Sequence, residues 1–173
     1  ARVPWREVDL TAIPPGERVG TLRHGVTRIG PDGRMTTWTT QNGLAANHVM
    51  SFYEDSSGTL WIGTHGGGLT RVKDGQLSSI SERHGLYNDK AFQILEDNDG
   101  SLWMNCNLGI WRTAIRQLHE VADGRRGRVD SVAYDTSDGM LSADGVGTNL
   151  AGWRMRDGTL WFSTSKGIVV IDP

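Results

Sequence analysis

Hydrophobic and polar residues alternate in short runs along the chain, and a turn follows each run. The clearest run of four lies between residues 49 and 80. Its first turn, Asp55–Gly58, opens with aspartate and closes with glycine, which is typical of a type I turn. Its last turn, Lys73–Gly75, is typical of a β-hairpin. The predicted strands are residues 49–54, 60–64, 69–72 and 77–80. This stretch therefore predicts a small antiparallel sheet.

The second of these strands recurs. Its segment runs from an aspartate through glycine and leucine to tryptophan, and it occurs three times. The tryptophans are Trp61, Trp103 and Trp161, and the turn glycines are Gly58, Gly100 and Gly158. The first two tryptophans are 42 residues apart and the next two are 58 apart. Four strands repeated every ~40–45 residues indicate β-propeller blades. A tryptophan at one repeated strand position is expected to pack between blades. The tryptophans on other strands, Trp38, Trp111 and Trp153, are also expected to belong to the core.

Two other motifs keep the same spacing. Asn42-Gly43-Leu44 matches His84-Gly85-Leu86, and a glycine that begins the third strand follows each tryptophan. We expect an all-β protein of about four blades, part of a larger propeller. The first unit is degenerate because Arg18 replaces the tryptophan, and the last lacks its outer strand. The expected units are residues 1–46, 47–88, 89–139 and 140–173.

The longer interval has a specific cause. Ile115, Leu118 and Val121 have helical spacing, so a short inserted helix is predicted near residues 113–122. The basic loop that follows, with Arg125, Arg126 and Arg128, is interpreted as a solvated loop.

The repeat resembles a known family. Asn42-Gly43-Leu44, the Trp61 segment with its Ile-Gly63, and Gly68-Leu-Thr-Arg71 resemble the two-component regulator propeller repeat. The resemblance implies a periplasmic or extracytoplasmic sensor that binds a ligand, often related to carbohydrates, and does no catalysis. The resemblance also implies that the complete propeller is a seven-bladed ring. Members of this family continue into a small β-sandwich, a transmembrane helix and usually a histidine kinase. The third unit departs from the pattern, with Met104-Asn-Cys106 in place of Ile-Gly-Thr.

Charge, cysteine content and hydropathy argue against several classes of function. The net charge of −2 argues against a nucleic-acid surface, and the single cysteine, Cys106, excludes an intrachain disulfide. No apolar run approaches the ~18 residues of a membrane span. Ala1 begins no leader sequence, so we expect a processed or excised piece. An incomplete ring of blades would expose apolar faces, so the expected partners are the remaining blades of a longer chain or a second copy.

Loops at one rim of the propeller are the candidate ligand site. The loop before a blade's first strand and the loop after its second strand open on the same rim of such a fold. The candidate residues on these loops are Asn47, His48, His65, Asp89, Lys90 and Asn107. The alternative, that they are ordinary solvated loop residues, stays open.

An enzyme is the second interpretation, either a lyase of the virginiamycin-inactivating type or a glycoside hydrolase; a protein-interaction scaffold is the third. Glu54-Asp55 and Glu96-Asp97 are acid pairs, but adjacent strand residues point to opposite faces and both pairs precede a turn. We interpret these aspartates as turn residues. The five histidines have no zinc-site spacing, and no metal or cofactor is expected.

Overall fold

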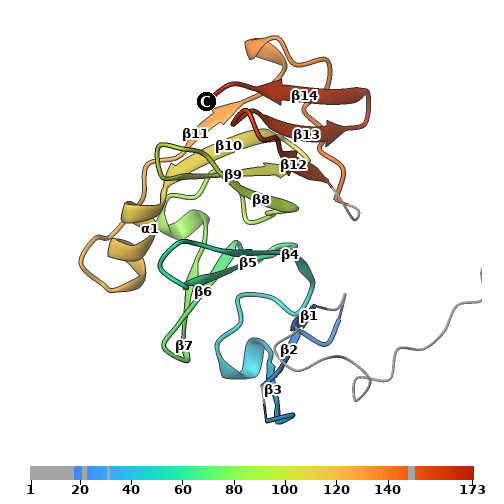
Figure 1. Ribbon diagram of the computed structural model, residues 1–173. Helices are drawn as coiled ribbons and strands as arrows, with labels where there is room; N and C mark the ends of the chain where they lie inside the picture. Colours follow the sequence, from blue (N-terminus) through green and yellow to red (C-terminus); the bar gives the residue numbers. More distant parts are fainter. Residues whose placement is uncertain (1–17, 21–22, 31, 148–150) are drawn as a thin grey trace, which may run out of the picture.

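Four antiparallel sheets follow one another along the chain in the computed structural model, which describes residues 18–20, 23–30, 32–147 and 151–173. Figure 1 shows the sheets stacked in chain order, with the blue first sheet at one end and the red last sheet at the other. Within each sheet, neighbouring strands are also consecutive in sequence. This arrangement of meandering sheets confirms the all-β, propeller-like fold.

Among the described residues, the two middle sheets have four strands each, and the two outer ones have three. The strands of the first and last sheets are β1 (Arg18–Gly20), β2 (Val26–Ile29), β3 (Met35–Trp38), β12 (Gly152–Arg154), β13 (Leu160–Thr164) and β14 (Gly167–Ile171). Those of the second and third sheets are β4 (Val49–Glu54), β5 (Leu60–Thr64), β6 (Leu69–Lys73), β7 (Gln76–Ile80), β8 (Gln93–Glu96), β9 (Ser101–Cys106), β10 (Gly109–Ala114) and β11 (Val132–Tyr134).

The inserted helix is confirmed. Helix α1 (Ile115–Ala122) connects β10 to β11 and therefore lies inside the third sheet's chain segment. It begins after Ala114 because Thr113 and Ala114 still pair with β9. Within the described ranges, no helix has the length and apolar character needed to cross a membrane.

Glycines recur at turn positions whose left-handed backbone conformation other residues rarely adopt. The Asn-Gly-Leu motif is a single 3-10 turn, Thr40–Asn42, that ends at Gly43 with φ of 112°. The corresponding Gly85 and Gly139 have φ of 93° and 96°. A left-handed residue at this position closes the turn, and glycine adopts that conformation without steric cost.

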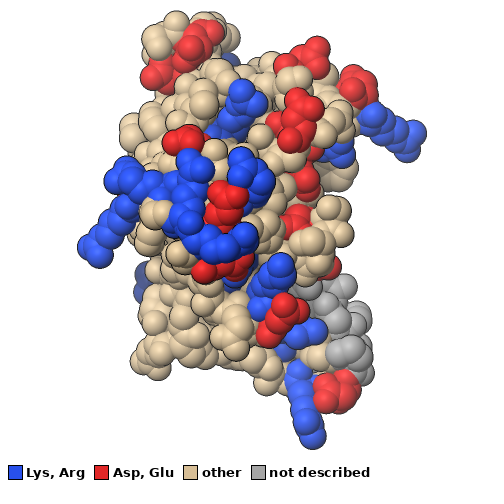
Figure 2. Space-filling model, turned by 90° about the vertical axis from the view of Figure 1, so that its left-hand side faces the viewer, with Lys and Arg blue, Asp and Glu red and all other residues tan. Residues whose placement is uncertain are grey.

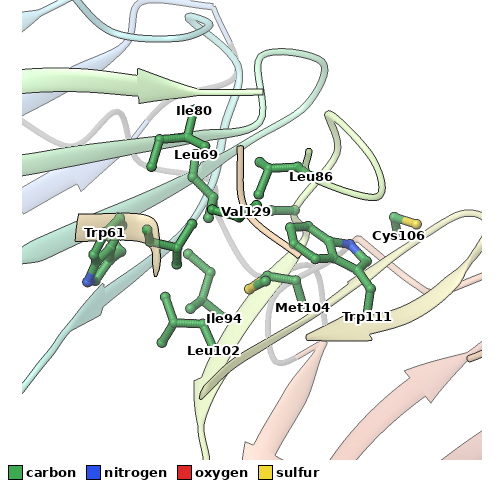
Figure 3. Packing of buried hydrophobic residues seen from close by; sticks show 12 residues of the cluster. Trp61, Leu69, Ile80, Leu86, Ile94, Leu102, Met104, Cys106, Trp111 and Val129 are labelled. Carbon is green, nitrogen blue, oxygen red and sulfur yellow. The ribbon is translucent and has the colours of Figure 1, made fainter. Parts of the chain in front are cut away.

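The sheets pack face to face through apolar side chains. Figure 3 shows the largest cluster, between the second and third sheets, to which Trp61, Leu69 and Ile80 contribute from one side and Leu102, Met104 and Trp111 from the other. Trp61 is fully buried there, and Trp103 is 3% exposed in the next interface, where it packs with Leu160 and Phe162 of the fourth sheet. Two of the three repeated tryptophans therefore pack between sheets.

The outer face of the fourth sheet is different. Trp153 and Trp161 lie opposite one another on β12 and β13, and their exposed fractions are 62% and 36%. Val170 on β14, 53% exposed, is paired with Trp161. The prediction that Trp153 belongs to the core is wrong, because no described sheet covers this face. Trp161 holds the repeated strand position but has no neighbouring sheet among the described residues.

Candidate functional site

The first strands of successive sheets lie side by side, since β4 contacts β8 and β8 contacts β12. In the second sheet the start of β4 is opposite the end of β5, with Val49 paired to Thr64. His48 precedes Val49 and His65 follows Thr64, so both histidines lie at the same edge. We call this edge, with the loops before β4 and β8 and after β5 and β9, the rim.

Two histidines form the centre of the rim. The rings of His48 and His65 stack with centroids 4.9 Å apart, and the ring of His65 also stacks on Phe92 at 5.8 Å. The His65 amide donates a hydrogen bond to the His48 carbonyl at 2.9 Å. The backbones of His65 and Lys90, in the next loop, form an isolated antiparallel β-bridge. Burial and the neighbouring His65 lower the pKa of His48 from its ordinary value of 6.5. The rim thus holds a close pair of imidazoles beside a lysine.

Asn47 and Asp89 use their side chains to shape the rim loops. Asn47 Oδ1 accepts a hydrogen bond from the Thr40 amide at 2.8 Å. Asp89 Oδ1 accepts from the Glu82 amide at 2.7 Å, and Glu82 Oε1 accepts from the Asp89 amide at 3.0 Å. The Asp89 carbonyl accepts from the amides of Gly66 and Gly68. The structure therefore gives both residues a role in holding the loops.

Three polar oxygens near the rim have no hydrogen-bond partner among the described residues. They belong to Ser51, Asn105 and Asn107, and each is buried. Asn105 lies on β9 at the position that Gly63 holds on β5, since both precede the last residue of their strand. Gly63 has no room for a larger residue because a Cβ there would lie 2.5 Å from Ser51 Oγ. The sequence marked this position only as a departure from Ile-Gly-Thr, which was the available signal for Asn105.

A second group of polar residues lies at the opposite edge, where the β4–β5 turn meets α1. Asp55 accepts hydrogen bonds from the Ser57 and Thr59 amides and from Trp61 Nε1, the last at 2.9 Å. Asp97 and Trp103 repeat this contact in the third sheet at 2.7 Å. Glu96 accepts a hydrogen bond from the Tyr53 hydroxyl. The aspartates are thus turn residues, as the sequence indicated, and they also accept hydrogen bonds from the indoles, which the sequence did not indicate.

Helix α1 brings His119 to this turn. His119 Nε2 lies 3.4 Å from Asp55 Oδ2, and its ring meets the Trp61 ring edge-on with centroids 5.2 Å apart. Arg71 NH1 lies 3.3 Å from His119 Nδ1, and Arg71 NH2 lies 2.6 Å from Asp123 Oδ1. Sequence reasoning missed this cluster, because nothing in the spacing of His119 indicates that the inserted helix folds back onto the second sheet.

Two cavities accompany the repeated Asp–Trp contact. One, of 790 Å³, lies over the cluster and is lined by residues such as Asp55, Lys73, His119 and Arg125. The other, of 310 Å³, lies between the third and fourth sheets and is lined by residues such as Trp103, Arg112 and Met140. Within the described ranges, no group of three or more His, Cys, Asp or Glu side chains is arranged to hold a metal ion.

The comparisons with known proteins fit this geometry. Residues 43–66, which run from the Asn-Gly-Leu turn through Trp61 to the rim, match the model described as two component regulator propeller. No curated protein matches the chain.

Solved structures share the fold. One is described as the extracellular domain of a hybrid two component system, BT3049, from B. thetaiotaomicron; it has a TM-score of 0.72 and 21% identity, over 90% of this chain and 20% of that one. A second, BT4673 from the same organism, has a TM-score of 0.69 and 22% identity, over 90% and 22%. Virginiamycin B lyase from Staphylococcus aureus has a TM-score of 0.56 and 19% identity, over 86% and 48%. The chain thus spans about a fifth of the length of the first two structures.

Proposed function

The chain carries the two-component regulator propeller repeat, and from this premise we propose that it is a non-catalytic, ligand-binding part of an extracytoplasmic sensor propeller. The observation that carries the proposal is the match over residues 43–66, because this segment holds both the Trp61 packing unit and the rim residue His65. The extracellular sensor domains with the same fold support the extracytoplasmic location.

The exposure of the two rim histidines and of Lys90 supports the proposal that a ligand binds there. His65 is exposed, and His48 and Lys90 are half-buried, so their polar groups are accessible from solvent. Stacked imidazoles offer flat faces and nitrogen atoms that donate or accept, and Lys90 adds a cation. Such a set suits a polar molecule with hydroxyl or carboxylate groups, including a sugar acid or a short oligosaccharide.

A binding screen tests this proposal. Mono- and oligosaccharides, with and without uronic acid units, are titrated into the purified chain and followed by calorimetry. We expect at least one class to bind, and the variants His65→Ala and Lys90→Ala to weaken its binding about tenfold or more, as lost charged hydrogen bonds do. Arg34→Ala, on an exposed loop, is the matched control and leaves affinity unchanged.

Two outcomes would contradict the proposal. Binding that the rim variants do not alter would move the site elsewhere. Turnover of a glycoside or of a streptogramin B by the chain would make it an enzyme instead, which is why product formation is measured by chromatography in the same samples.

The exposed face of the fourth sheet is proposed to contact another blade. Every described interface between sheets places one sheet's face on an apolar face of the next, and Trp153, Trp161 and Val170 form an apolar face that no described sheet covers. Its natural partner is a further blade of a longer chain; a second copy is the other candidate. Light scattering on the chain distinguishes them: Trp153→Ser restores a monomer if copies associate through this face, and leaves the mass unchanged if they do not.

A further inference from the structure

Helix α1 packs on the neighbouring sheets through Leu118, which is fully buried in the cluster between the second and third sheets, and through a small set of polar contacts with the second sheet. Asp55, which follows β4, and Arg71 of β6 contact His119 of α1, and Arg71 also contacts Asp123 at the end of the helix. His119 lies between them, because Asp55 is near its Nε2 and Arg71 is near its Nδ1. Figure 2, which faces the side on which α1 lies in Figure 1, shows acidic and basic side chains interspersed over this region.

The contacts fix the protonation of His119. An arginine only donates hydrogen bonds, so Nδ1 must accept from Arg71 NH1, and the proton of the neutral ring is left on Nε2, facing Asp55. Adding a second proton would place an imidazolium directly against a guanidinium that is 6% exposed. The docked arrangement therefore requires neutral His119.

We propose that α1 is an acid-sensitive latch, in which protonation of His119 releases the helix from the second sheet and opens the wall of the adjacent 790 Å³ cleft. The released segment would carry Asp123 away from Arg71. The latch is independent of the rim, which lies at the other edge of the same sheets.

Burial and two of the three neighbouring charges lower the pKa of His119, and the net shift is downward. Burial lowers its pKa below 6.5, Asp55 opposes this, and Arg71 and Lys73 lower the pKa further. The hydrogen bond from Arg125, together with that from Arg71, lowers the pKa of Asp123 to about 2, so Asp123 stays ionised wherever His119 titrates. Glu96 and Asp99 line the same cleft from the third sheet.

The sign of the effect follows by linkage. Free His119 has an ordinary pKa of 6.5 and docked His119 a lower one, so the released form binds more protons. Docking is therefore complete above pH about 7.5 and weakens as pH falls through 6.5 towards the lowered value. Each unit by which docking lowers the pKa raises the opening equilibrium constant about tenfold at low pH.

Nuclear magnetic resonance on the whole chain tests the latch. The indole N–H of Trp61, which donates to Asp55, and the amide of Asp123 are followed from pH 8 to pH 5, together with hydrogen exchange of α1. We expect both signals to move with one transition below pH 6.5, and the α1 amides to lose protection relative to those of β9.

Substitutions separate titration from simple packing. In His119→Gln the amide can still donate to Asp55 and accept from Arg71 but does not titrate, so we expect docking at pH 8 and no transition. His24→Gln, at an exposed histidine that precedes β2, should leave the transition in place. Signals of Trp61 and α1 that stay constant down to pH 5 in the wild-type chain, or a transition that survives in His119→Gln, would overturn the proposal.

Discussion

Two neighbouring interfaces of this molecule contain the same aspartate–tryptophan contact, but different side chains cover that contact in each. Between the second and third sheets, the Asp55–Trp61 pair and Arg71 are covered by α1, which supplies His119 and Asp123. Between the third and fourth sheets, the Asp97–Trp103 pair is present, but Tyr134 stacks on the indole, and no α-helix of the described residues covers it. The repeat therefore supplies a common scaffold, and what lies between the repeats decides how each interface is sealed.

The arginines show the difference most clearly. Arg71 and Arg112 hold the same position, each paired across the sheet with the repeated tryptophan. Arg71 has an ion pair of 2.6 Å with Asp123. Arg112 lies over the Trp103 ring at 5.3 Å and has no ion pair among the described residues, beside a cavity of 310 Å³. A strand position can thus be conserved between repeats of one chain while its electrostatic surroundings are not.

Removing an indole should have the largest effect and be similar in both interfaces. Trp61→Ala and Trp103→Ala each delete a side chain that is at most 3% exposed, so we expect a loss of about 3–5 kcal/mol of unfolding free energy. Trp153→Ala, at a side chain 62% exposed, is the control and should cost far less. Urea denaturation followed by circular dichroism measures all three. Equal losses for the buried and exposed positions would show that the stabilisation by these indoles does not come from their burial between the sheets.

Removing the turn aspartate is the next largest change. Asp55→Ala leaves the Thr59 amide and the Trp61 indole N–H buried without an acceptor, which should cost about 2–4 kcal/mol. Asp157→Ala is the matched variant in the fourth sheet, where Trp161 donates to Thr159 instead, and a smaller loss is expected. Thermal and urea unfolding compare them. The comparison fails if Asp157→Ala is the more damaging substitution.

The arginines should give the smallest effect and the sharpest contrast. Arg71→Met leaves Asp123 and His119 without their shared partner, so we expect a loss of about 1–3 kcal/mol. Arg112→Met removes only the contact with the Trp103 ring, and a change below about 1 kcal/mol is expected. The same denaturation series decides between them, and indistinguishable losses would mean that the contacts of Arg71 with α1 add no stability to this interface.

The sequence predicted the parts of the fold that repeat. The strands around Trp61, the turn Asp55–Gly58 and the inserted helix all follow from local patterns, because each depends on residues close in sequence. It could not show that Asp55 also accepts from the indole six residues later, since a turn residue and an indole acceptor look alike in sequence.

Contacts between segments that are far apart in the sequence could not be predicted either. His119 and Asp55 are far apart in the chain, and their meeting depends on the direction in which α1 folds back. Of the rim residues, the sequence placed His48 and His65 at one edge, as their stacking shows, but could not distinguish them from Asn47, whose side chain is used by its own loop. The exposure of Trp153 was also hidden, since it depends on whether a further sheet is present.

The loop after α1 is a suitable place to insert a label into this protein. Gly124 and Gly127 are exposed, and a Cβ at either would meet nothing within 4 Å. Extra residues between them should leave every strand pair intact, because the chain already accommodates a helix at this point. A fluorophore or an epitope placed there would report on this edge of the protein in living cells without touching the histidines of the rim.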